Sequence, residues 1–168
     1  MQEDLSQPAP QTEAVFEVSA EQVKANLRTA MKRTGSTFNW IAGLSLLNTV
    51  LILTKANLMM LGGLGLTIVV DVLFSQAGPQ IQPIGFGINI TIALVFVALG
   101  MWAGKGHKLA FYIGMTLYAL DGCLYIFIQD WVNVAFHGYF LYLLYRGLKA
   151  VDIINAAMAD VDAKVANQ

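Results

Sequence analysis

The feature that most constrains this chain is a series of long apolar blocks, separated by short polar or glycine-rich breaks. A helix needs about 20 mostly apolar residues to cross the hydrocarbon core of a bilayer. The blocks approach this length, so each is predicted to cross the membrane as a helix. The five predicted spans cover residues 37–54, 58–75, 86–103, 109–129 and 131–147. The predicted fold is therefore all-α, a polytopic membrane helical bundle with about five transmembrane helices.

The composition agrees with a membrane setting. Hydrophobic residues make up 57% of the 168 residues and charged residues 12%, whereas soluble domains contain roughly 45–50% apolar and 25% charged residues. An ordinary water-soluble domain is therefore excluded. The net charge of -1 argues against a nucleic-acid partner, because phosphate binding needs a clustered excess of Lys and Arg. We expect an integral protein of a bacterial cytoplasmic membrane.

The chain divides into four regions along its length. Its first residues are polar, contain prolines and lack apolar periodicity, which predicts disorder. Ser19 and Gln22 then have the spacing of a capping box at a helix start. Prolines and glycines at 76–85 predict a loop inside the membrane region. The regions are a disordered tail (1–18), an amphipathic interfacial helix (19–35), the transmembrane bundle (36–150) and a short amphipathic C-terminal helix (151–168).

Basic side chains surround the apolar face of the helix predicted at 19–35. Such a helix can lie on the membrane surface and contact anionic headgroups. A solvated basic segment that anchors the first span is the alternative. Tryptophans near predicted span ends favour the same interface. The residues expected at the headgroups are Lys24, Arg28, Lys32, Arg33, Trp40, Trp102 and Trp131.

The distribution of basic residues conflicts with an odd number of spans. The basic helix at 19–35 predicts a cytoplasmic N-terminus under the positive-inside rule. With five spans, a second basic group then faces the opposite side of the membrane. Either one segment does not cross, or the first helix alone sets the orientation. The second group consists of Lys55, Lys105, Lys108, Arg146 and Lys149.

Several polar side chains fall inside the predicted spans. Ionisable groups at membrane depth are costly, so they usually face the bundle interior and find partners. Alternating spans place most of them in one leaflet, where they would form a single network. Its members are Asp71, Asn89, Asp121, His137 and Asn48.

Three roles are open for this predicted network. Hydrogen bonds between the spans could fix helix packing. A carboxylate and an imidazole in low dielectric could instead bind a proton or a cation. Two Asp and one His could also hold a divalent metal, but paired-ligand spacing is absent and no metal site is assigned.

Small residues in the apolar blocks are predicted to let helices approach closely. Gly100 and Gly104 form a GxxxG pair, for which an oligomer contact is the alternative. The packing glycines are Gly62, Gly65, Gly100, Gly104, Gly122 and Gly138. Cys123 also lies in an apolar block and is expected to be a small buried hydrophobe.

The sequence carries no catalytic motif that would make the chain an enzyme. It lacks a GxSxG elbow, a Walker loop and a dinucleotide fingerprint, and short connectors leave no catalytic domain. No cofactor is assigned, although the tyrosine-rich last hairpin could hold a lipid, a quinone or a pigment.

We interpret the chain as a non-enzymatic accessory, assembly or structural subunit of a membrane. The expected partners are membrane lipids and either further copies of the chain or other subunits of a larger membrane complex. The alternative is a small proton- or cation-coupled transporter or channel component that uses the buried Asp/His/Asn layer.

Overall fold

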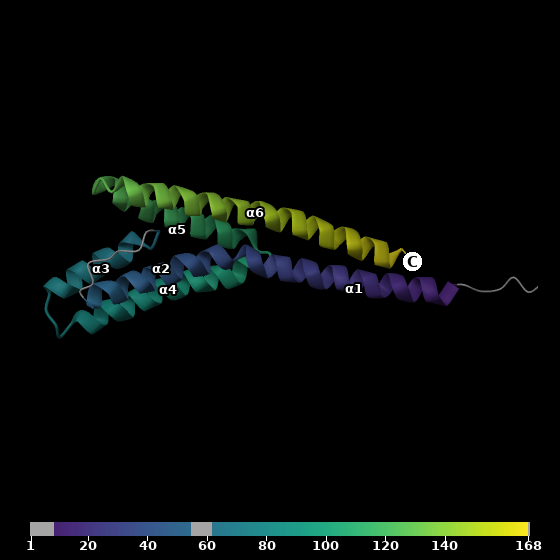
Figure 1. Cartoon of the computed structure of the whole chain (residues 1–168), viewed down its shortest axis with the longest axis horizontal. Helices are drawn as coiled ribbons and strands as arrows, with labels where there is room; N and C mark the ends of the chain where they lie inside the picture. The colour runs from purple at the N-terminus through teal and green to yellow at the C-terminus, as the bar shows by residue number, and fades with distance from the viewer. Residues whose placement is uncertain (1–8, 55–61, 168) are drawn as a thin grey trace, which may run out of the picture.

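The structure, a computed structural model, describes residues 9–54 and 62–167. Within these ranges every regular element is a helix and no strand occurs. The all-α helical bundle predicted from the sequence is confirmed. The helices, shown in Figure 1, are α1 (Ala9–Thr34), α2 (Ser36–Leu53), α3 (Gly65–Gln76), α4 (Gln82–Ala103), α5 (Lys108–Phe127) and α6 (Trp131–Ala166).

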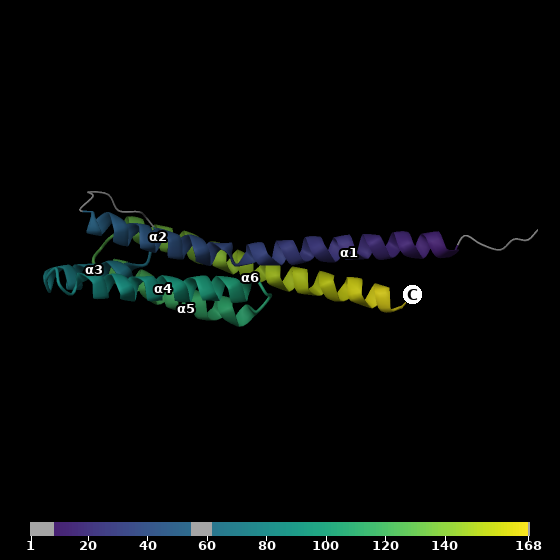
Figure 2. The same ribbon diagram turned by 90° about the horizontal axis from the view of Figure 1, so that it is seen from below.

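The helices form a bundle and an arm that share α6 (Figures 1 and 2). The bundle contains α2, α3, α4, α5 and the first half of α6. The arm contains α1 and the second half of α6, which run side by side away from the bundle. Lys24 of α1 pairs with Asp162 of α6 at 2.8 Å, so the arm is joined by charge as well as by apolar contact.

The N-terminal helix differs from its prediction in extent. α1 begins at Ala9, so Ser19 lies inside the helix and does not cap it. The predicted disorder is therefore wrong for residues 9–18, while residues 1–8 lie outside the described part of the chain. The helix includes this polar stretch because Pro10, at the second helical position, is tolerated in the first turn of a helix.

The structure does not support a separate amphipathic helix at 19–35. α1 runs in line with α2 (Figure 2) and continues from Ala9 to Thr34. Its apolar residues Leu27 and Met31 belong to the same cluster as Ile154 and Met158 of α6. Part of the apolar face of α1 thus packs against α6.

At the arm end of the bundle, α2 and α4 touch through their backbones. A Cβ atom added to Gly35 would lie 2.0 Å from the carbonyl oxygen of Gly100. Phe38 packs beside this contact, with its ring centroid 5.5 Å from that of Phe111 and 6.4 Å from that of Phe96. Gly100 was predicted as a packing glycine, whereas its partner Gly35 was not.

The second predicted span is not one continuous helix. Its first residues lie in 55–61, outside the described part, and Gly62, Gly63 and Leu64 are not helical. The helix that follows, α3, has only 12 residues. At 1.5 Å per residue it extends about 18 Å, too short to cross a hydrocarbon core. Figure 1 shows α3 beginning inside the bundle and ending at the end opposite the arm.

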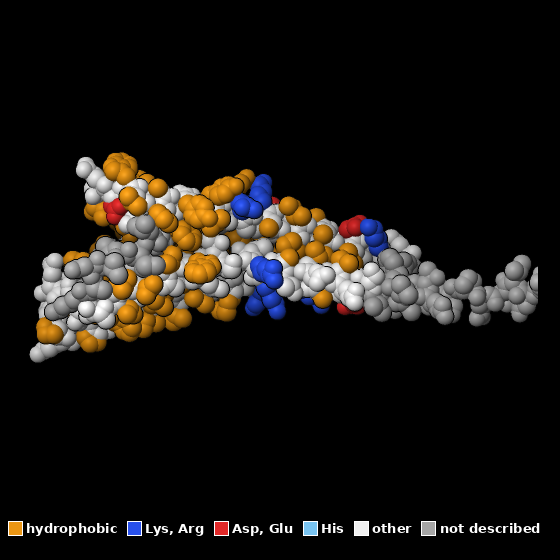
Figure 3. All heavy atoms as spheres, in the orientation of Figure 1, with side chains coloured by type: hydrophobic (Ala, Val, Ile, Leu, Met, Phe, Trp, Pro, Cys, Tyr) orange, Lys and Arg blue, Asp and Glu red, His pale blue; other side chains and the backbone are white. Residues whose placement is uncertain are grey.

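Three helical stretches are long and apolar enough to cross a membrane: Ser19–Leu53, Gln82–Ala103 and Lys108–Phe127. The five-span count is therefore not reproduced. Apolar side chains cover much of the bundle surface that Figure 3 displays, and Lys and Arg gather where the bundle meets the arm. A multi-helix bundle compatible with an integral membrane protein is what the structure supports.

The remaining differences concern a connector, a cysteine and the C-terminus. The loop predicted at 76–85 shortens to 77–81, because Pro83 lies in the first turn of α4, where a missing N–H has no cost. Cys123 is exposed on α5 and is not a buried hydrophobe. The helix predicted at 151–168 is the continuation of α6 into the arm.

Candidate functional site

The buried N-terminus of α3 is held by a carboxylate from another helix. Asp121 of α5 accepts hydrogen bonds of 2.8 Å from the backbone N–H of Gly65 and from that of Leu66. The first N–H groups of a helix have no partner within the helix, and its dipole favours a negative charge there. Asp121 thus serves as the cap that the local sequence Gly62–Leu64 does not provide.

His137 of α6 completes the surroundings of this carboxylate. Its Nε2 lies 3.0 Å from Asp121 Oδ2, and its Nδ1 lies 2.9 Å from the carbonyl oxygen of Asn133. A peptide carbonyl only accepts, so Nδ1 carries a hydrogen. The Asp121–His137 contact then needs a second hydrogen, on Nε2 or on the carboxyl group. Either placement leaves the buried pair with no net charge.

Two further side chains bind the non-helical segment before α3. The hydroxyl of Tyr118 donates to the carbonyl oxygen of Gly62 at 2.8 Å, and the side-chain oxygen of Asn133 accepts from the Gly62 N–H at 3.3 Å. Gly62 has a φ of 82°, a conformation that favours glycine. Tyr118 also stacks on His137 with ring centroids 4.4 Å apart. We refer to Tyr118, Asp121, Asn133 and His137 as the α3 clamp.

A second polar cluster joins α3 to α4 and α2. The side-chain nitrogen of Asn89 donates to Asp71 Oδ1 at 2.8 Å and lies 3.1 Å from the carbonyl oxygen of Thr67 and 2.9 Å from the hydroxyl of Thr49. Asn89 is 0% exposed and Asp71 6%. Within the described residues, Asp71 Oδ2 and Asn89 Oδ1 have no hydrogen-bond partner. We refer to Asp71 and Asn89 as the acid–amide pair.

The predicted single network is therefore divided in two. Asp71 follows Gly65 by six residues on α3, about 9 Å along the helix axis, and its hydrogen bonds lead to α4 and not to the α3 clamp. Asn48 is buried beside the non-helical segment, where a Cβ on Gly63 would lie 2.7 Å from its side-chain nitrogen. In the described ranges, no group of three His, Cys, Asp or Glu side chains converges.

Sequence reasoning missed two members of the clamp. Asn133 precedes His137 by four residues and Tyr118 precedes Asp121 by three, so both share a helix face with a predicted site residue. That signal was available. Their binding partner, the backbone of Gly62, could not be predicted, because the sequence of an apolar, glycine-containing block does not reveal that the helix is interrupted there.

The predicted packing glycines have different surroundings. Gly65 faces the ring of Tyr125, Gly104 the backbone of Lys32, and Gly122 the ring of His137. Gly138 faces open space, with no atom within 4 Å of an added Cβ, so its prediction is wrong. The reason is that α6 turns the face bearing His137, and not the face bearing Gly138, toward α5.

The predicted headgroup residues lie mostly at the ends of the bundle. Trp40 is 67% exposed near the arm end, and Trp131 is 66% exposed at the opposite end. Trp102 lies at the C-terminal end of α4, and its ring centroid is 5.7 Å from that of His107. Lys24 forms the ion pair with Asp162 inside the arm. Arg28 and Lys32 lie near the junction, along a groove between α1, α6 and the α4–α5 turn.

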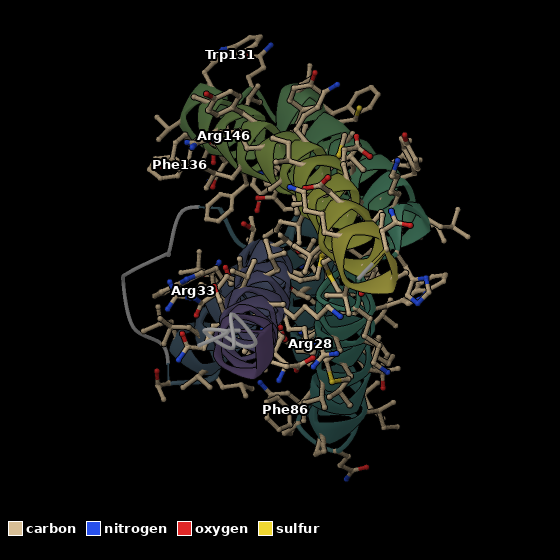
Figure 4. All side chains as sticks on the ribbon, turned by 90° about the vertical axis from the view of Figure 1, so that its right-hand side faces the viewer. Arg28, Arg33, Phe86, Trp131, Phe136 and Arg146 are labelled. Carbon is tan, nitrogen blue, oxygen red and sulfur yellow. The ribbon has the colours of Figure 1, made fainter. Side chains whose placement is uncertain are left out.

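A larger groove of about 570 Å³ runs between α1–α2 and α6 at the same junction. Arg33 lies on one wall and Arg146 on the other, and Figure 4, viewed along the arm, shows both on the same side of the molecule. Neither guanidinium has a carboxylate partner in the described part of the chain. Arg146 lies over the Tyr142 ring at 6.0 Å.

No protein-family model, no characterised protein and no solved structure matches this chain.

Proposed function

We propose that this chain is an integral membrane protein that acts as a non-enzymatic accessory or structural subunit, packed against lipids and other membrane proteins. The observation that carries the proposal is the α3 clamp. Both oxygens of Asp121 accept backbone hydrogen bonds, and Tyr118 and Asn133 bind the backbone of Gly62. Polar groups that would serve catalysis in an enzyme are here engaged in holding a broken helix.

The topology that we propose has four crossings and one half-length helix. α2 and α3 both end at the end of the bundle opposite the arm, while α4, α5 and α6 each run its full length (Figure 1). Non-helical backbone at membrane depth is tolerated where protein buries it. The segment before α3 meets this condition, because Leu64 is 2% exposed and Gly62 is bonded on both its N–H and its carbonyl.

The charge distribution supports this topology and gives it an orientation. Four crossings place both chain ends on one side, which removes the conflict that five spans create. All Lys and Arg residues in the described ranges then lie on the arm side of the bundle or in the arm. The positive-inside rule makes that side cytoplasmic. These residues are Lys24, Arg28, Lys32, Arg33, Lys105, Lys108, Arg146, Lys149 and Lys164.

Contact with anionic lipid is part of the proposed role. Arg33 and Arg146 face each other across a groove at the level of the basic belt, where the phosphates of the cytoplasmic leaflet would lie. Guanidinium groups bind phosphate oxygens in a bidentate manner. A headgroup in this groove would supply the negatively charged partner that neither arginine has among the described residues.

The proposal is tested on the tagged full chain, extracted from its own membrane into polymer nanodiscs and weighed by native mass spectrometry. We expect a complex of fixed stoichiometry, with a second copy or another membrane protein, that retains phospholipid. A monomer that carries protons or cations across proteoliposome membranes would overturn the proposal.

Transport is the second candidate, and the discontinuous helix favours it. In many transporters, half-helices meet near the middle of the membrane and their ends contribute to substrate and ion sites. α3 starts at such a depth, with a buried carboxylate at its N-terminus. Flux that disappears in Asp71→Asn while the protein remains folded would favour this role over the structural one.

A further inference from the structure

The acid–amide pair lacks one hydrogen. The Asn89 side-chain nitrogen has two hydrogens, and two of its neighbours, Asp71 Oδ1 and the Thr67 carbonyl, can only accept. This assigns the nitrogen and the oxygen of the amide. The Thr49 hydroxyl also bonds the Asp71 carboxyl group. Even so, two buried atoms, Asn89 Oδ1 and Asp71 Oδ2, have no hydrogen-bond partner among the described residues.

Within the described residues, the helices packed against α3 carry one basic side chain, Lys108 at the start of α5, and it pairs with Asp152 of α6. α3 packs against α4, α2 and α5. α2 and α4 contain no Asp, Glu, Lys, Arg or His, and α3 contains only Asp71. The titratable groups that α5 turns toward α3 are Asp121 and Tyr125, and the nearest base, His137 of α6, is bonded to Asp121. Among the residues that the structure describes, an ionised Asp71 would thus be a buried charge without a counter-ion, which is strongly unfavourable.

We propose that the Asp71 carboxyl group binds a proton on Oδ2 and donates it to the side-chain oxygen of Asn89. One added hydrogen turns an unpaired acceptor into a donor and satisfies both orphaned atoms. A carboxylic acid and a primary amide then pair through two hydrogen bonds, with the amide N–H donating to Oδ1 and the acid O–H donating to the amide oxygen. The site holds one proton, bound between α3 and α4 and next to Thr49 of α2.

The two carboxyl groups of the bundle, Asp121 and Asp71, therefore differ in their hydrogen-bond donors. Asp121 accepts from two backbone N–H groups and faces His137, whereas Asp71 has only side-chain partners, the Asn89 amide and the Thr49 hydroxyl. This inference does not depend on the subunit role, because a protonated Asp71 is compatible with a structural protein and with a carrier.

Infrared spectroscopy of the full chain in lipid nanodiscs at neutral pH tests the proposal. A protonated carboxyl group absorbs at higher frequency than a carboxylate and shifts downward in heavy water. We expect such a band in the wild type, a loss of intensity from it in Asp71→Asn and its full retention in Asp160→Asn, which removes an exposed carboxylate of the arm. A wild type without the band, or a band of the same intensity in wild type and Asp71→Asn, would overturn the proposal.

Stability provides a second, independent readout. Asn at position 71 reproduces the neutral acid, because its amide can donate to Asn89 and accept from it, whereas Leu does neither. We expect Asp71→Asn to unfold within about 2 °C of the wild type and Asp71→Leu to unfold several degrees lower. Failure of Asp71→Asn to fold would contradict a neutral Asp71, since Asn mimics the acid and not the carboxylate.

Two further measurements separate a proton from other occupants. In Asn89→Leu the acid loses its acceptor, so its band should move to higher frequency, and an unchanged band would contradict the proposed bond. Exchanging potassium for sodium should leave the spectrum and the unfolding temperature unchanged. A rise in unfolding temperature that is specific to sodium would assign the site to a cation and overturn the proton.

Discussion

Asp121 Oδ2 accepts the backbone N–H of Gly65 at 2.8 Å, although 56 residues separate the two in the chain. This bond ties α5 to the start of α3 and lets a helix begin inside the bundle. A helix that starts at membrane depth exposes N–H groups that lipid cannot bind. The half-length helix and its distant cap are thus one structural unit.

Asp121→Asn should destabilise the protein strongly. An amide has only one acceptor oxygen, so at least one of the N–H groups of Gly65 and Leu66 loses its partner. We expect a loss of about 2–4 kcal/mol, measured by thermal unfolding in detergent. Asp160→Asn is the control, because its exposed pair with Lys164 contributes little. Equal unfolding temperatures for the two variants would contradict the capping role.

Gly35→Ala should separate α2 from α4. The added methyl group would lie 2.0 Å from a backbone oxygen of Gly100, which cannot turn away as a side chain can. We expect a loss of about 1–3 kcal/mol, as for other overpacked contacts. Gly43→Ala, inside α2, has no atom within 4 Å of its new Cβ and should gain up to about 1 kcal/mol through helix propensity. Thermal unfolding of both variants checks that the two substitutions change the stability in opposite directions.

Single cysteines should report four crossings. On a Cys123→Ala background, Ser19→Cys and Ala166→Cys should react with an impermeant thiol reagent only after cells are permeabilised. Gln80→Cys and Gln129→Cys, in the connectors at the other end of the bundle, should react in intact cells. Labelling of Ser19→Cys and Ala166→Cys from opposite sides would restore an odd number of spans.

The combined substitution Arg33→Gln and Arg146→Gln should weaken the binding of anionic lipid. Both guanidinium groups line the groove at the junction, so their loss removes the charge that would hold a phosphate. Native mass spectrometry should show less co-purified anionic phospholipid than in the wild type. Lys164→Gln, far out on the arm, is the matched control, and equal losses in both proteins would point to non-specific attraction.

Asp130 should make a pH-dependent contribution at the start of α6. Its carboxylate accepts from the side chain of Asn133 at 2.8 Å and from the backbone N–H of Asn133 at 3.1 Å. These hydrogen bonds hold the pKa of Asp130 below its ordinary value of 3.8. The stabilisation is therefore complete above pH 3.8 and is lost as the pH falls through the lowered pKa.

Two substitutions measure this contribution. Asp130→Ala should cost about 0.5–2 kcal/mol at neutral pH, the usual range for a lost N-cap. Asp130→Asn keeps a capping oxygen without an ionisable group. The difference in unfolding temperature between wild type and Asp130→Asn should therefore shrink below pH 3.8, and a constant difference would contradict the linkage.

Much of the fold was predictable because its signals are local. The blocks at 37–54, 86–103 and 109–129 differ from α2, α4 and α5 by only a few residues at either end. The block at 58–75 was misread, because a glycine-containing apolar stretch has the same composition whether it is one helix or a broken one. The two polar clusters contain residues that the sequence predicted as one network. Their division into a clamp and an acid–amide pair depends on distances between helices.

By itself, the sequence determined that the chain forms apolar helices and buries a few carboxyl, amide and imidazole groups, since helix formation and partition into hydrocarbon depend on nearby residues alone. Only the tertiary structure decided that α3 starts inside the bundle, that Asp121 caps it, and that Asp71 faces Asn89. A backbone group at membrane depth takes whatever partner the neighbouring helices bring within 3 Å or so. Which helices are neighbours is a property of the whole packing.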